Sequence, residues 1–403
     1  MSVGYGQKVS LPLRTANLII WADNSELRAH FRNNHSDETS RASLKLSMKL
    51  DQLNSYLLNI RNRLGEISTS GIWAEAKFPM RPTKASAKPL LKDFTEIVAH
   101  EGWKLYKKLL DEVELGEFIR QINELPAGSS ISIETDCALF PWEILYPVEF
   151  NINWPKAVRS GRTVQPERFW GNRYLIEYRI SPVKGSAGIP PIAEHRNGRS
   201  FVSFNVNPTI DEDSPELAYK PVMQHTDFFN KNLRKPRRGE LRMDGESIKE
   251  FLFSDSRSNL IYLYCHGQSD DPYQGGGGEL LQVDKDSDID PSFFAQRKEK
   301  YRRGPIVILN SCSSGSYSSL SFSSFHSELI GQRALGVIGP TIRMPVTFAS
   351  AFGQKLVREY LKGRIPIGQI LRNMRKELLA KNNPLGLFYV LQCPWHVKAP
   401  LKK

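Results

Sequence analysis

Apolar and polar residues alternate differently in the first third of the chain and in the remainder. The run ANLIIWA, Ala16 to Ala22, is typical of a strand, and the polar stretch that continues through Arg41 indicates a loop. From about Ala42 to Leu64, leucine, methionine and isoleucine recur at roughly helical spacing, which predicts one amphipathic helix. A second helical region is predicted for about Leu91 to Glu124, with a break near Gly116. We therefore expect the first third to be mainly helical.

From Ser130 onward the pattern becomes that of strands. SISIET alternates with the two-residue period of a strand, LFPWEILYP indicates an aromatic turn with a short helix, and RYLIEYRI predicts a further strand. The residues from Ser181 to Ser200 include a proline pair and several glycines, which is typical of a linker. This composition predicts a boundary between structural units in that stretch.

After Arg199, apolar runs alternate with helical stretches. Runs this continuous suit strands that are buried on both faces, as in a parallel sheet covered by helices. The expected fold class is therefore α/β: a mostly parallel sheet sandwiched by helices, preceded by a mainly helical N-terminal accessory region. The predicted strands are SFVSFNVN, NLIYLYC, GELLQV, PIVILN, ALGVIG and LFYVLQ, and the predicted helices lie near Val222–Leu233, Phe348–Leu361 and Gly368–Lys381, with another from Pro291 that has Asp290 as its N-cap.

Composition narrows the class of protein. The chain has 403 residues, of which 40% are hydrophobic and 24% charged, values close to globular averages and unlike those of disordered or collagen-like chains. Its 4 cysteines form no CxxC pair, which favours a reducing, cytoplasmic location over a disulfide framework. No apolar signal segment opens the chain, and no run of about 18 apolar residues follows, so we expect neither secretion nor a membrane span.

The net charge of +12 suits a polyanion or an acidic partner. Basic residues gather at Arg297 to Arg303 and, more densely, at Lys231 to Arg242. A solvated charged face is the ordinary interpretation of both stretches, and contact with a polyanion is the alternative. In the denser stretch that contact would be made by Lys231, Arg234, Lys235, Arg237 and Arg238.

Patterns for metals are weak. The aspartates from Asp284 to Asp290 alternate as in a calcium loop, but Ile289 replaces the required glycine and Ala295 the required glutamate. His30 and His35 have the spacing of a zinc-finger pair, yet no cysteine lies near them in the sequence. We therefore expect no metal and no cofactor.

Two predicted strands end in potentially reactive residues. NLIYLYC leads into His266 and Gly267, and PIVILNS leads into Cys312. Because the carboxyl ends of parallel strands meet at one edge of a sheet, these side chains are expected at the same edge. An imidazole can take the proton of a cysteine thiol and later protonate a leaving amine, and the backbone N–H groups of Gly267 and Cys312 can bind an oxyanion.

A lone cysteine or histidine is usually a structural residue, a small buried side chain or one bonded to the backbone. Here both follow apolar strands, both are followed by a glycine within three residues, and His266 precedes Cys312 by 46 residues. That spacing is similar to the histidine about 50 residues before a caspase-type cysteine. The joint pattern favours a catalytic Cys–His dyad.

The order LIYLYCHGQSDD, ELLQV, VILNSCSSG, ALGVIGPT and FASAFGQKLVREYLKGRIPIGQILRNMR resembles the CHAT family of caspase-like cysteine peptidases, and the resemblance covers about Ser130 to Gln392. It implies a caspase-like α/β sandwich, with His266 as general base, Cys312 as nucleophile and Gly267 beside the oxyanion. It also implies that Asn310, two residues before the nucleophile, lines the primary specificity pocket. Many members carry a tryptophan and then an acidic residue where this chain has Arg343 to Thr347.

Together these patterns predict residues 1–128 as an accessory region, either independent or part of a degenerate caspase-like half, and residues 129–403 as a CHAT-like peptidase domain with its core at about 198–403. We expect a regulated cytoplasmic cysteine endopeptidase that cleaves a protein substrate. A macromolecular activator would dock on the N-terminal helices or on Lys231 to Arg242, and the serine-rich stretch Ser311 to Ser327 would be a surface loop or a mobile loop beside the cleft. The alternatives are a non-catalytic caspase-like scaffold and a basic polyanion-binding module.

Overall fold

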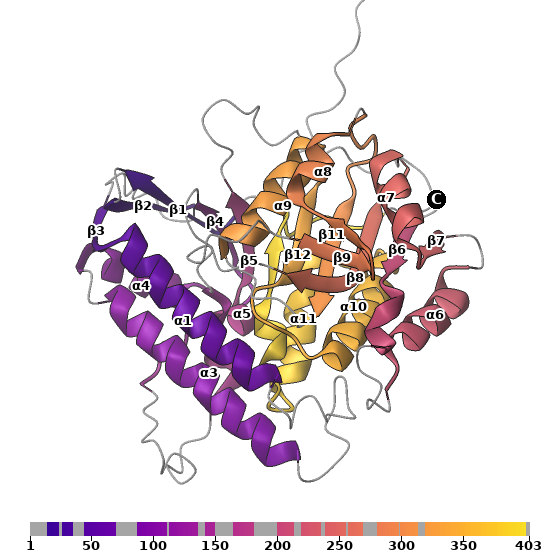
Figure 1. Cartoon of the computed structure of the whole chain (residues 1–403). Coiled ribbons are helices and arrows are strands. Elements are labelled where there is room, and N and C mark those ends of the chain that lie inside the picture. The colour runs from indigo at the N-terminus through magenta and orange to yellow at the C-terminus, as the bar shows by residue number, and fades with distance from the viewer. Residues whose placement is uncertain are drawn as a thin grey trace, which may run out of the picture.

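The computed structural model describes residues 14–23, 26–34, 44–69, 87–110, 113–135, 142–149, 164–180, 200–212, 219–234, 238–254, 257–268, 280–297, 299–312 and 319–399. They form two sheets that lie side by side, each covered by helices (Figure 1). The expected fold class, α/β with a mostly parallel sheet between helices, is confirmed.

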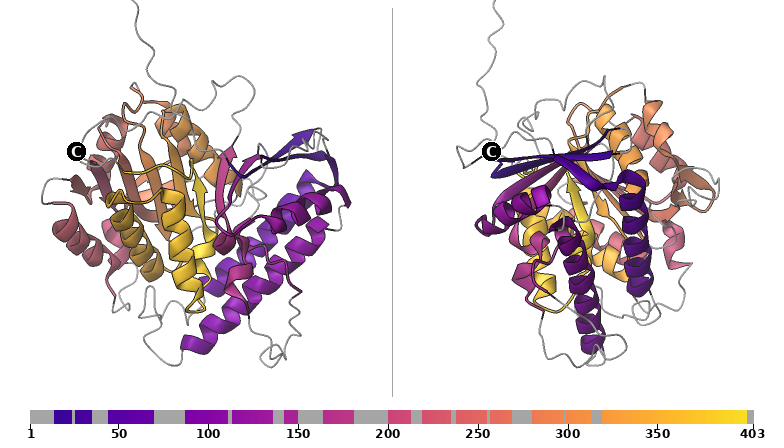
Figure 2. Two further views of the ribbon diagram at one scale, coloured as in Figure 1. Left: turned by 180° about the vertical axis from the view of Figure 1, so that it is seen from behind. Right: turned by 90° about the vertical axis from the view of Figure 1, so that its left-hand side faces the viewer.

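The first sheet has the strand order β3-β2-β1-β4-β5. Its centre is parallel, since β1 pairs in parallel with β4 and β4 with β5, while β2 and β3 add antiparallel strands at one side. Helices α1, α3 and α4 lie against this sheet (Figure 2). The elements are β1 Ala16–Asp23, β2 Glu26–Asn33, β3 Leu44–Lys49, α1 Leu50–Thr69, α3 Ala87–Leu110, α4 Val113–Glu124, β4 Ser130–Thr135, η1 Trp142–Ile144, η3 Pro166–Arg168, α5 Trp170–Arg173 and β5 Leu175–Ile180.

Two expectations for this part were wrong. The polar stretch after the first strand is not all loop, because it contains β2, in which buried Leu27 and Ala29 alternate with more exposed residues. The single helix predicted from Ala42 is instead strand β3 followed by α1. The second helical region is described as α3, which ends at Leu110, and α4, which begins at Val113 and contains Gly116.

The second sheet is the larger. Strands β7, β6, β8, β11 and β12 run parallel to their neighbours, β13 closes one side antiparallel to β12, and the hairpin β9–β10 extends the carboxyl end of β8. The elements are β6 Val202–Val206, η4 Pro208–Asp211, α6 Pro221–Asn232, β7 Gly239–Arg242, α7 Gly245–Ser254, β8 Leu260–Gln268, β9 Leu280–Asp284, β10 Ser287–Ile289, α8 Pro291–Ala295, β11 Ile306–Cys312, α9 Ser319–Gly331, β12 Gly336–Pro340, α10 Val346–Leu361, α11 Ile367–Leu379, η5 Leu385–Phe388 and β13 Tyr389–Gln392.

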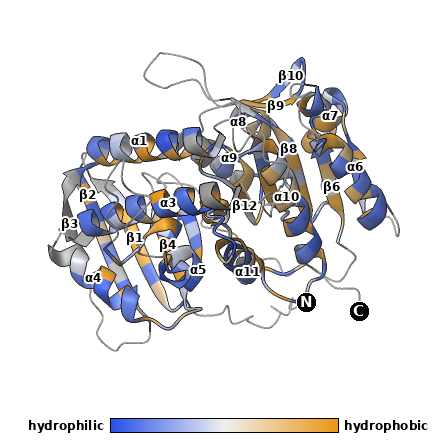
Figure 3. Cartoon of the chain, turned by 90° about the horizontal axis from the view of Figure 1, so that it is seen from below, coloured by the Kyte–Doolittle hydropathy of each residue, from blue (hydrophilic) through white to orange (hydrophobic). Residues whose placement is uncertain are grey.

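Helices cover both faces of the second sheet. Helices α6, α10 and α11 lie on one face and α7, α8 and α9 on the other (Figure 1). The strands between them are largely hydrophobic, while the helices carry polar residues on their outer sides (Figure 3). Ile306 to Ser311 of β11 and all residues of β12 are buried. This burial explains why their continuous apolar runs predicted these strands from the sequence.

Most predictions for this part are confirmed, including the N-cap. The Asp290 carboxylate accepts hydrogen bonds from the backbone N–H groups of Ser292 at 2.6 Å and Phe293 at 3.3 Å. The serine-rich stretch is not a loop throughout, because it includes helix α9, which buries Phe325 and Leu329. Residues 313–318 of that stretch and residues 181–199 of the expected linker lie outside the described residues.

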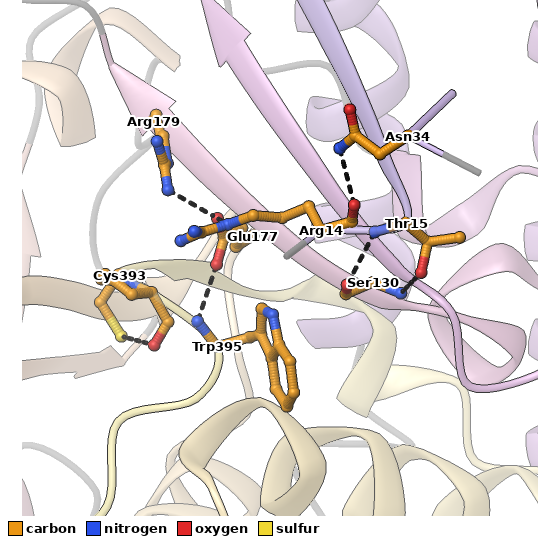
Figure 4. A network of polar contacts seen from close by, with 9 residues as sticks. Arg14, Thr15, Asn34, Ser130, Glu177, Arg179, Cys393 and Trp395 are labelled. Atoms are coloured by element: carbon orange, nitrogen blue, oxygen red, sulfur yellow. Dashed lines mark hydrogen bonds and ion pairs between the residues drawn. The ribbon is translucent and has the colours of Figure 1, made fainter. Parts of the chain in front are cut away.

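Buried charged groups lie at the junction of the two sheets, which we call the seam. Glu177 of β5 is fully buried, and its carboxylate accepts hydrogen bonds from Arg14 Nε and from the backbone N–H of Trp395, each at 2.8 Å (Figure 4). The expected boundary after residue 128 passes between two strands of the first sheet, because β1, which precedes it, pairs with β4, which follows it.

A second buried ion pair lies in the same seam. Arg375 of α11 donates to the Glu143 carboxylate at 3.3 Å and to the carbonyl oxygen of Tyr389 at 2.5 Å, and Tyr178 of β5 also donates to Glu143. Burial raises the pKa of the Glu143 carboxyl, and the nearby Arg375 guanidinium opposes that shift. The stability of the seam therefore depends on the Glu143 carboxylate and the Arg375 guanidinium being present together.

Candidate functional site

His266 and Cys312 are neighbours across two parallel strands. β8 and β11 pair over seven positions, from Leu260 with Ile306 to His266 with Cys312, so the last pair stands at the carboxyl ends of both strands. Directly paired residues in a sheet have Cα atoms about 5 Å apart and side chains on the same face. The two residues predicted as a dyad are thus brought together by register.

The alternation of side chains along β8 and β11 identifies the face of the sheet on which His266 lies. Tyr262 and Asn310 contact each other through their side chains, and Asn310 also bonds to a backbone carbonyl of α10. Since side chains alternate, His266 belongs to this same α10-covered face, and the backbone of Cys312 pairs with that of His266. His266 is buried, with 8% of its surface exposed, and Cys312 is the last residue of β11.

Gly267 is buried and stands next to His266, on the part of β8 that pairs with β9. Its partner in the sheet is Leu281, so the hairpin β9–β10 lies directly beside the candidate oxyanion position. A glycine there keeps the backbone free of a side chain, which suits close approach of a ligand. The oxyanion role itself stays a prediction.

Asn310 has a different environment from the one expected. It is fully buried, its Nδ2 donates to Tyr262 Oη at 2.8 Å and to the Ala349 carbonyl at 2.7 Å, and its Oδ1 accepts from Tyr389 Oη at 2.6 Å. Both amide protons therefore go to groups of the protein itself. This burial does not fit a side chain that lines a substrate pocket, and it makes Asn310 a link between β8, β11, β13 and α10 instead.

The hydrogen bonds continue from Tyr262 into α6. His225 Nε2 lies 2.8 Å from Tyr262 Oη, and His225 Nδ1 lies 2.8 Å from the Pro221 carbonyl oxygen. Because a carbonyl only accepts, Nδ1 carries the proton and Nε2 accepts from the tyrosine. Burial lowers the pKa of His225 to about 3, so this histidine is neutral near pH 7. We call Asn310, Tyr262, Tyr389 and His225 the buried network.

The chain after β12 returns across the same face. Tyr264, two residues before His266, donates from its Oη to the Val346 carbonyl at 3.0 Å. Further along α10, a Cβ added to Gly353 would stand 2.3 Å from Tyr262 Oη and 2.5 Å from Asn310 Nδ2. Helix α10 is therefore packed directly on the strands that carry His266 and Cys312. Sequence patterns missed these contacts because each joins residues that are far apart along the chain.

The weak metal patterns have structural explanations. Asp284 accepts a hydrogen bond from the backbone of Gly245, and Asp290 caps α8. Within the described residues, no group of three or more histidine, cysteine or acidic side chains is arranged to hold a metal ion. His30 lies on β2, and His35 falls outside the described residues.

The basic cluster is only partly described. Lys231 Nζ lies 3.9 Å from Asp227 Oδ2, and Arg234 Nη1 donates a hydrogen bond to Asn230 Oδ1 at 3.5 Å. Arg238 is exposed. Lys235 and Arg237 lie outside the described residues. Nothing in this arrangement supports a polyanion contact. In the other basic stretch, Arg297 is buried and stacks on the Tyr301 ring at 4.0 Å, which is a structural role.

None of the helices in the described ranges combines the length with the apolar character needed to cross a bilayer.

Comparison with known proteins gives distant likenesses. No model of a known protein family matches the chain. Over 150 residues, 34% of the chain, it is 28% identical to a probable protease of Vitiosangium sp.. The matched segment spans 19% of that protein, about a fifth of the relative's length.

Among solved structures the chain is similar in shape to separase of Saccharomyces cerevisiae, determined in two crystal structures of the separase–securin complex. The TM-scores are 0.48 and 0.47 with 12% and 13% identity, over 94% of this chain and 30% of separase. Scores at this level describe a distant likeness of overall shape and identify no function.

Proposed function

We propose that the chain is a cysteine endopeptidase of the CHAT type, with His266 as general base and Cys312 as nucleophile. The observation that carries the proposal is the pairing of these two residues at the carboxyl ends of adjacent parallel strands. The sequence match to a probable protease and the resemblance of LIYLYCHGQSDD and VILNSCSSG to the CHAT motifs support the same class of reaction.

The reaction follows from the chemistry of the two groups. His266 takes the thiol proton, and the Cys312 thiolate attacks the carbonyl carbon of the substrate peptide bond, whose π electrons move to oxygen. Backbone N–H groups at Gly267 and Cys312 stabilise that oxyanion. The imidazolium then protonates the amide nitrogen as the C–N bond breaks, which leaves a thioester on Cys312. Water, deprotonated by His266, hydrolyses the thioester and regenerates the thiol.

Asn310 acts in this proposal through the buried network and not by contact with substrate. Its bonds to Tyr262 and Tyr389 tie β11 to β8 and, across β12, to β13, and the register of β8 with β11 sets the spacing of His266 and Cys312. Selectivity then comes from residues around the carboxyl edge of the sheet. We expect no strict requirement for aspartate at the cleavage position.

Control by a macromolecular partner is the second part of the proposal. A cytoplasmic peptidase with an unrestrained dyad would degrade its host. The N-terminal helices cover the first sheet, which the seam joins to the second sheet, so a partner bound to these helices could act on the site. A partner that stabilises the competent state by about 3 kcal/mol changes the active fraction by a little over a hundredfold. A non-catalytic scaffold is the competing function, and it predicts partner binding without cleavage.

The test is cleavage of a library of quenched fluorescent peptides by the wild-type chain and by Cys312→Ala, His266→Ala and Cys137→Ala, each alone and with proteins encoded beside it. Cys312→Ala and His266→Ala are expected to lose at least about a hundredfold in kcat/KM while their unfolding temperatures stay near that of the wild type. Cys137→Ala is the matched control and keeps its activity. Cleavage that survives in Cys312→Ala would refute the cysteine mechanism.

A further inference from the structure

The carboxyl edge that holds His266 and Cys312 is also formed by the segment after β12, Thr341 to Pro345. β12 runs parallel to β11, so this segment leaves the sheet at the same edge as Cys312. It ends where Val346 accepts the hydrogen bond from Tyr264. The segment therefore runs from the end of β12, the neighbour of the strand that carries Cys312, to a contact with β8, the strand that carries His266.

Most of this segment is buried, but one side chain is not. Ile342 and Met344 are 4% and 0% exposed, whereas Arg343 between them is exposed. The backbone on one side is fixed by the Thr341 N–H, which donates to the Phe388 carbonyl at 2.8 Å. A backbone held in this way presents the residue at its centre in one orientation at the edge of the sheet.

The centre of the segment is held from the other sheet. Helix α1 runs from the first sheet toward the second (Figure 3), and near its end the fully buried Ser68 hydroxyl lies 2.7 Å from the Arg343 carbonyl oxygen. The same hydroxyl lies 2.9 Å from the Gly65 carbonyl of its own helix. Gly65 faces the same residue: a Cβ added to Gly65 would lie 3.5 Å from both the backbone nitrogen and the Cβ of Arg343.

We propose that Ser68 is a positioning residue that holds the segment Thr341 to Pro345 in place beside the His266–Cys312 pair and thereby sets the affinity for substrate. The inference rests on the proposed peptidase function and names the route by which the N-terminal region acts on the site. A displacement of α1, by a partner or by substitution, moves the Arg343 backbone and weakens substrate binding without changing the reactivity of the thiol.

The chain offers a matched control in Thr95 of α3. Its buried hydroxyl lies 2.6 Å from the Asn382 carbonyl, in the turn after α11, and 2.8 Å from the Leu91 carbonyl of its own helix. Thr95 thus makes the same kind of bond from the N-terminal helices to the second sheet's helices, but to a turn that does not follow a strand of the candidate site. Ser68→Ala and Thr95→Val each delete one such hydroxyl.

The experiment combines steady-state kinetics with hydrogen exchange on the full chain. On the best-cleaved peptide of the fluorescent library, Ser68→Ala should raise KM about fivefold, the scale of one net hydrogen bond, with kcat within about twofold of wild type. Alkylation of Cys312 by iodoacetamide should keep its wild-type rate. Amide exchange across residues 341–345 should become faster in Ser68→Ala and stay unchanged in Thr95→Val.

A size series at Gly65 tests the same contact without removing a hydroxyl. Gly65→Ala adds a Cβ at ordinary contact distance and should keep the wild-type KM, whereas Gly65→Leu should raise it by pushing on Arg343. Unchanged exchange across 341–345 in Ser68→Ala, or equal effects of Ser68→Ala and Thr95→Val, would overturn the inference. If the wild type cleaves no peptide either alone or with the proteins encoded beside it, the proposed peptidase function fails, while the exchange comparison still decides whether Ser68 holds the segment.

Discussion

The two sheets share a parallel centre flanked by helices, yet they differ at the carboxyl ends of their strands. In the second sheet the register sets His266 beside Cys312. In the first sheet the last residue of β4, Thr135, stands between Ile20 and Ile180. At these paired strand ends, the same local architecture presents a candidate nucleophile and base in the second sheet and a threonine between two isoleucines in the first.

The first sheet uses its buried polar groups at the seam instead. Glu177 and Glu143 accept hydrogen bonds from Arg14 and Arg375 and from the backbone after β13. Burying a carboxylate beside a guanidinium contributes little net stability, but removing one partner leaves an uncompensated charge. The comparison teaches that the first sheet braces the second, whereas the second holds the proposed chemistry.

The largest effect should come from breaking the brace. Arg375→Met leaves the Glu143 carboxyl buried without its cation and should cost about 3–5 kcal/mol of unfolding free energy, measured by urea denaturation at pH 7. The control is Lys362→Met, which removes an exposed partner of Glu359 on α10 and should change stability by less than about 1 kcal/mol. A loss at Arg375→Met as small as that of the control would mean that the seam does not join the sheets.

The next effect concerns the packing of α10 on the buried network. Gly353→Ala adds a methyl group within 2.5 Å of Tyr262 Oη and Asn310 Nδ2 and should cost about 1–3 kcal/mol. Because this displaces the strands that carry the dyad, peptide cleavage should fall with it. Gly331→Ala is the matched control, since a Cβ there meets nothing within 4 Å, and it should preserve both stability and activity. Wild-type behaviour of Gly353→Ala would contradict the close packing described for this face.

A smaller effect is expected from acid. The pKa of His225 is lowered to about 3 by burial, below the ordinary 6.5, so the unfolded chain binds more protons than the folded chain between these values. Stability therefore falls as the pH drops through that window, with about 2 kcal/mol from this group between pH 7 and pH 5. The difference in urea unfolding free energy between the two pH values should be smaller by that amount in His225→Gln. An identical difference in both proteins would contradict the neutral, buried state of His225.

The smallest effect sharpens the comparison between the sheets. Cys137 follows β4 in the sequence by two residues, much as Cys312 stands at the end of β11, but no histidine ends either strand that pairs with β4. Cys137→Ser should therefore leave peptide cleavage within about twofold of wild type. Loss of cleavage in this variant would move the chemistry toward the first sheet.

Strands buried on both faces were predictable from the sequence because their own side chains carry the signal. NLIYLYC and PIVILN are largely apolar runs that lead into His266 and, through Ser311, into Cys312, the last pair in the register of β8 with β11. The pairing of those ends, and hence the dyad, followed from the general rule for parallel sheets. Strand β2 was missed because only alternate residues are buried, and its polar residues resemble a loop.

Tertiary contacts explain what the sequence did not reveal. Asn310 bonds to Ala349 and Tyr389, which are 39 and 79 residues away, so no local pattern could distinguish this buried amide from one that lines a pocket. Helix α9 forms in a serine-rich stretch because Phe325 and Leu329 are buried in the core, a packing effect that overrides weak local preference. The seam joins Glu177 to Trp395, 218 residues away.

The central claim, that His266 activates Cys312, can be tested without a substrate or an activator. The full chain is treated with limiting iodoacetamide over a range of pH, and the rate at each cysteine is followed by mass spectrometry of peptides. Cys265 and Cys393 are buried, and burial raises the pKa of the Cys393 thiol, so both should react slowly. Cys312 should be alkylated fastest at pH 7, and His266→Ala should slow it by at least about tenfold at pH 7 but little above pH 9, where thiols ionise unaided. An alkylation rate at Cys312 that His266→Ala leaves unchanged at every pH would contradict the dyad.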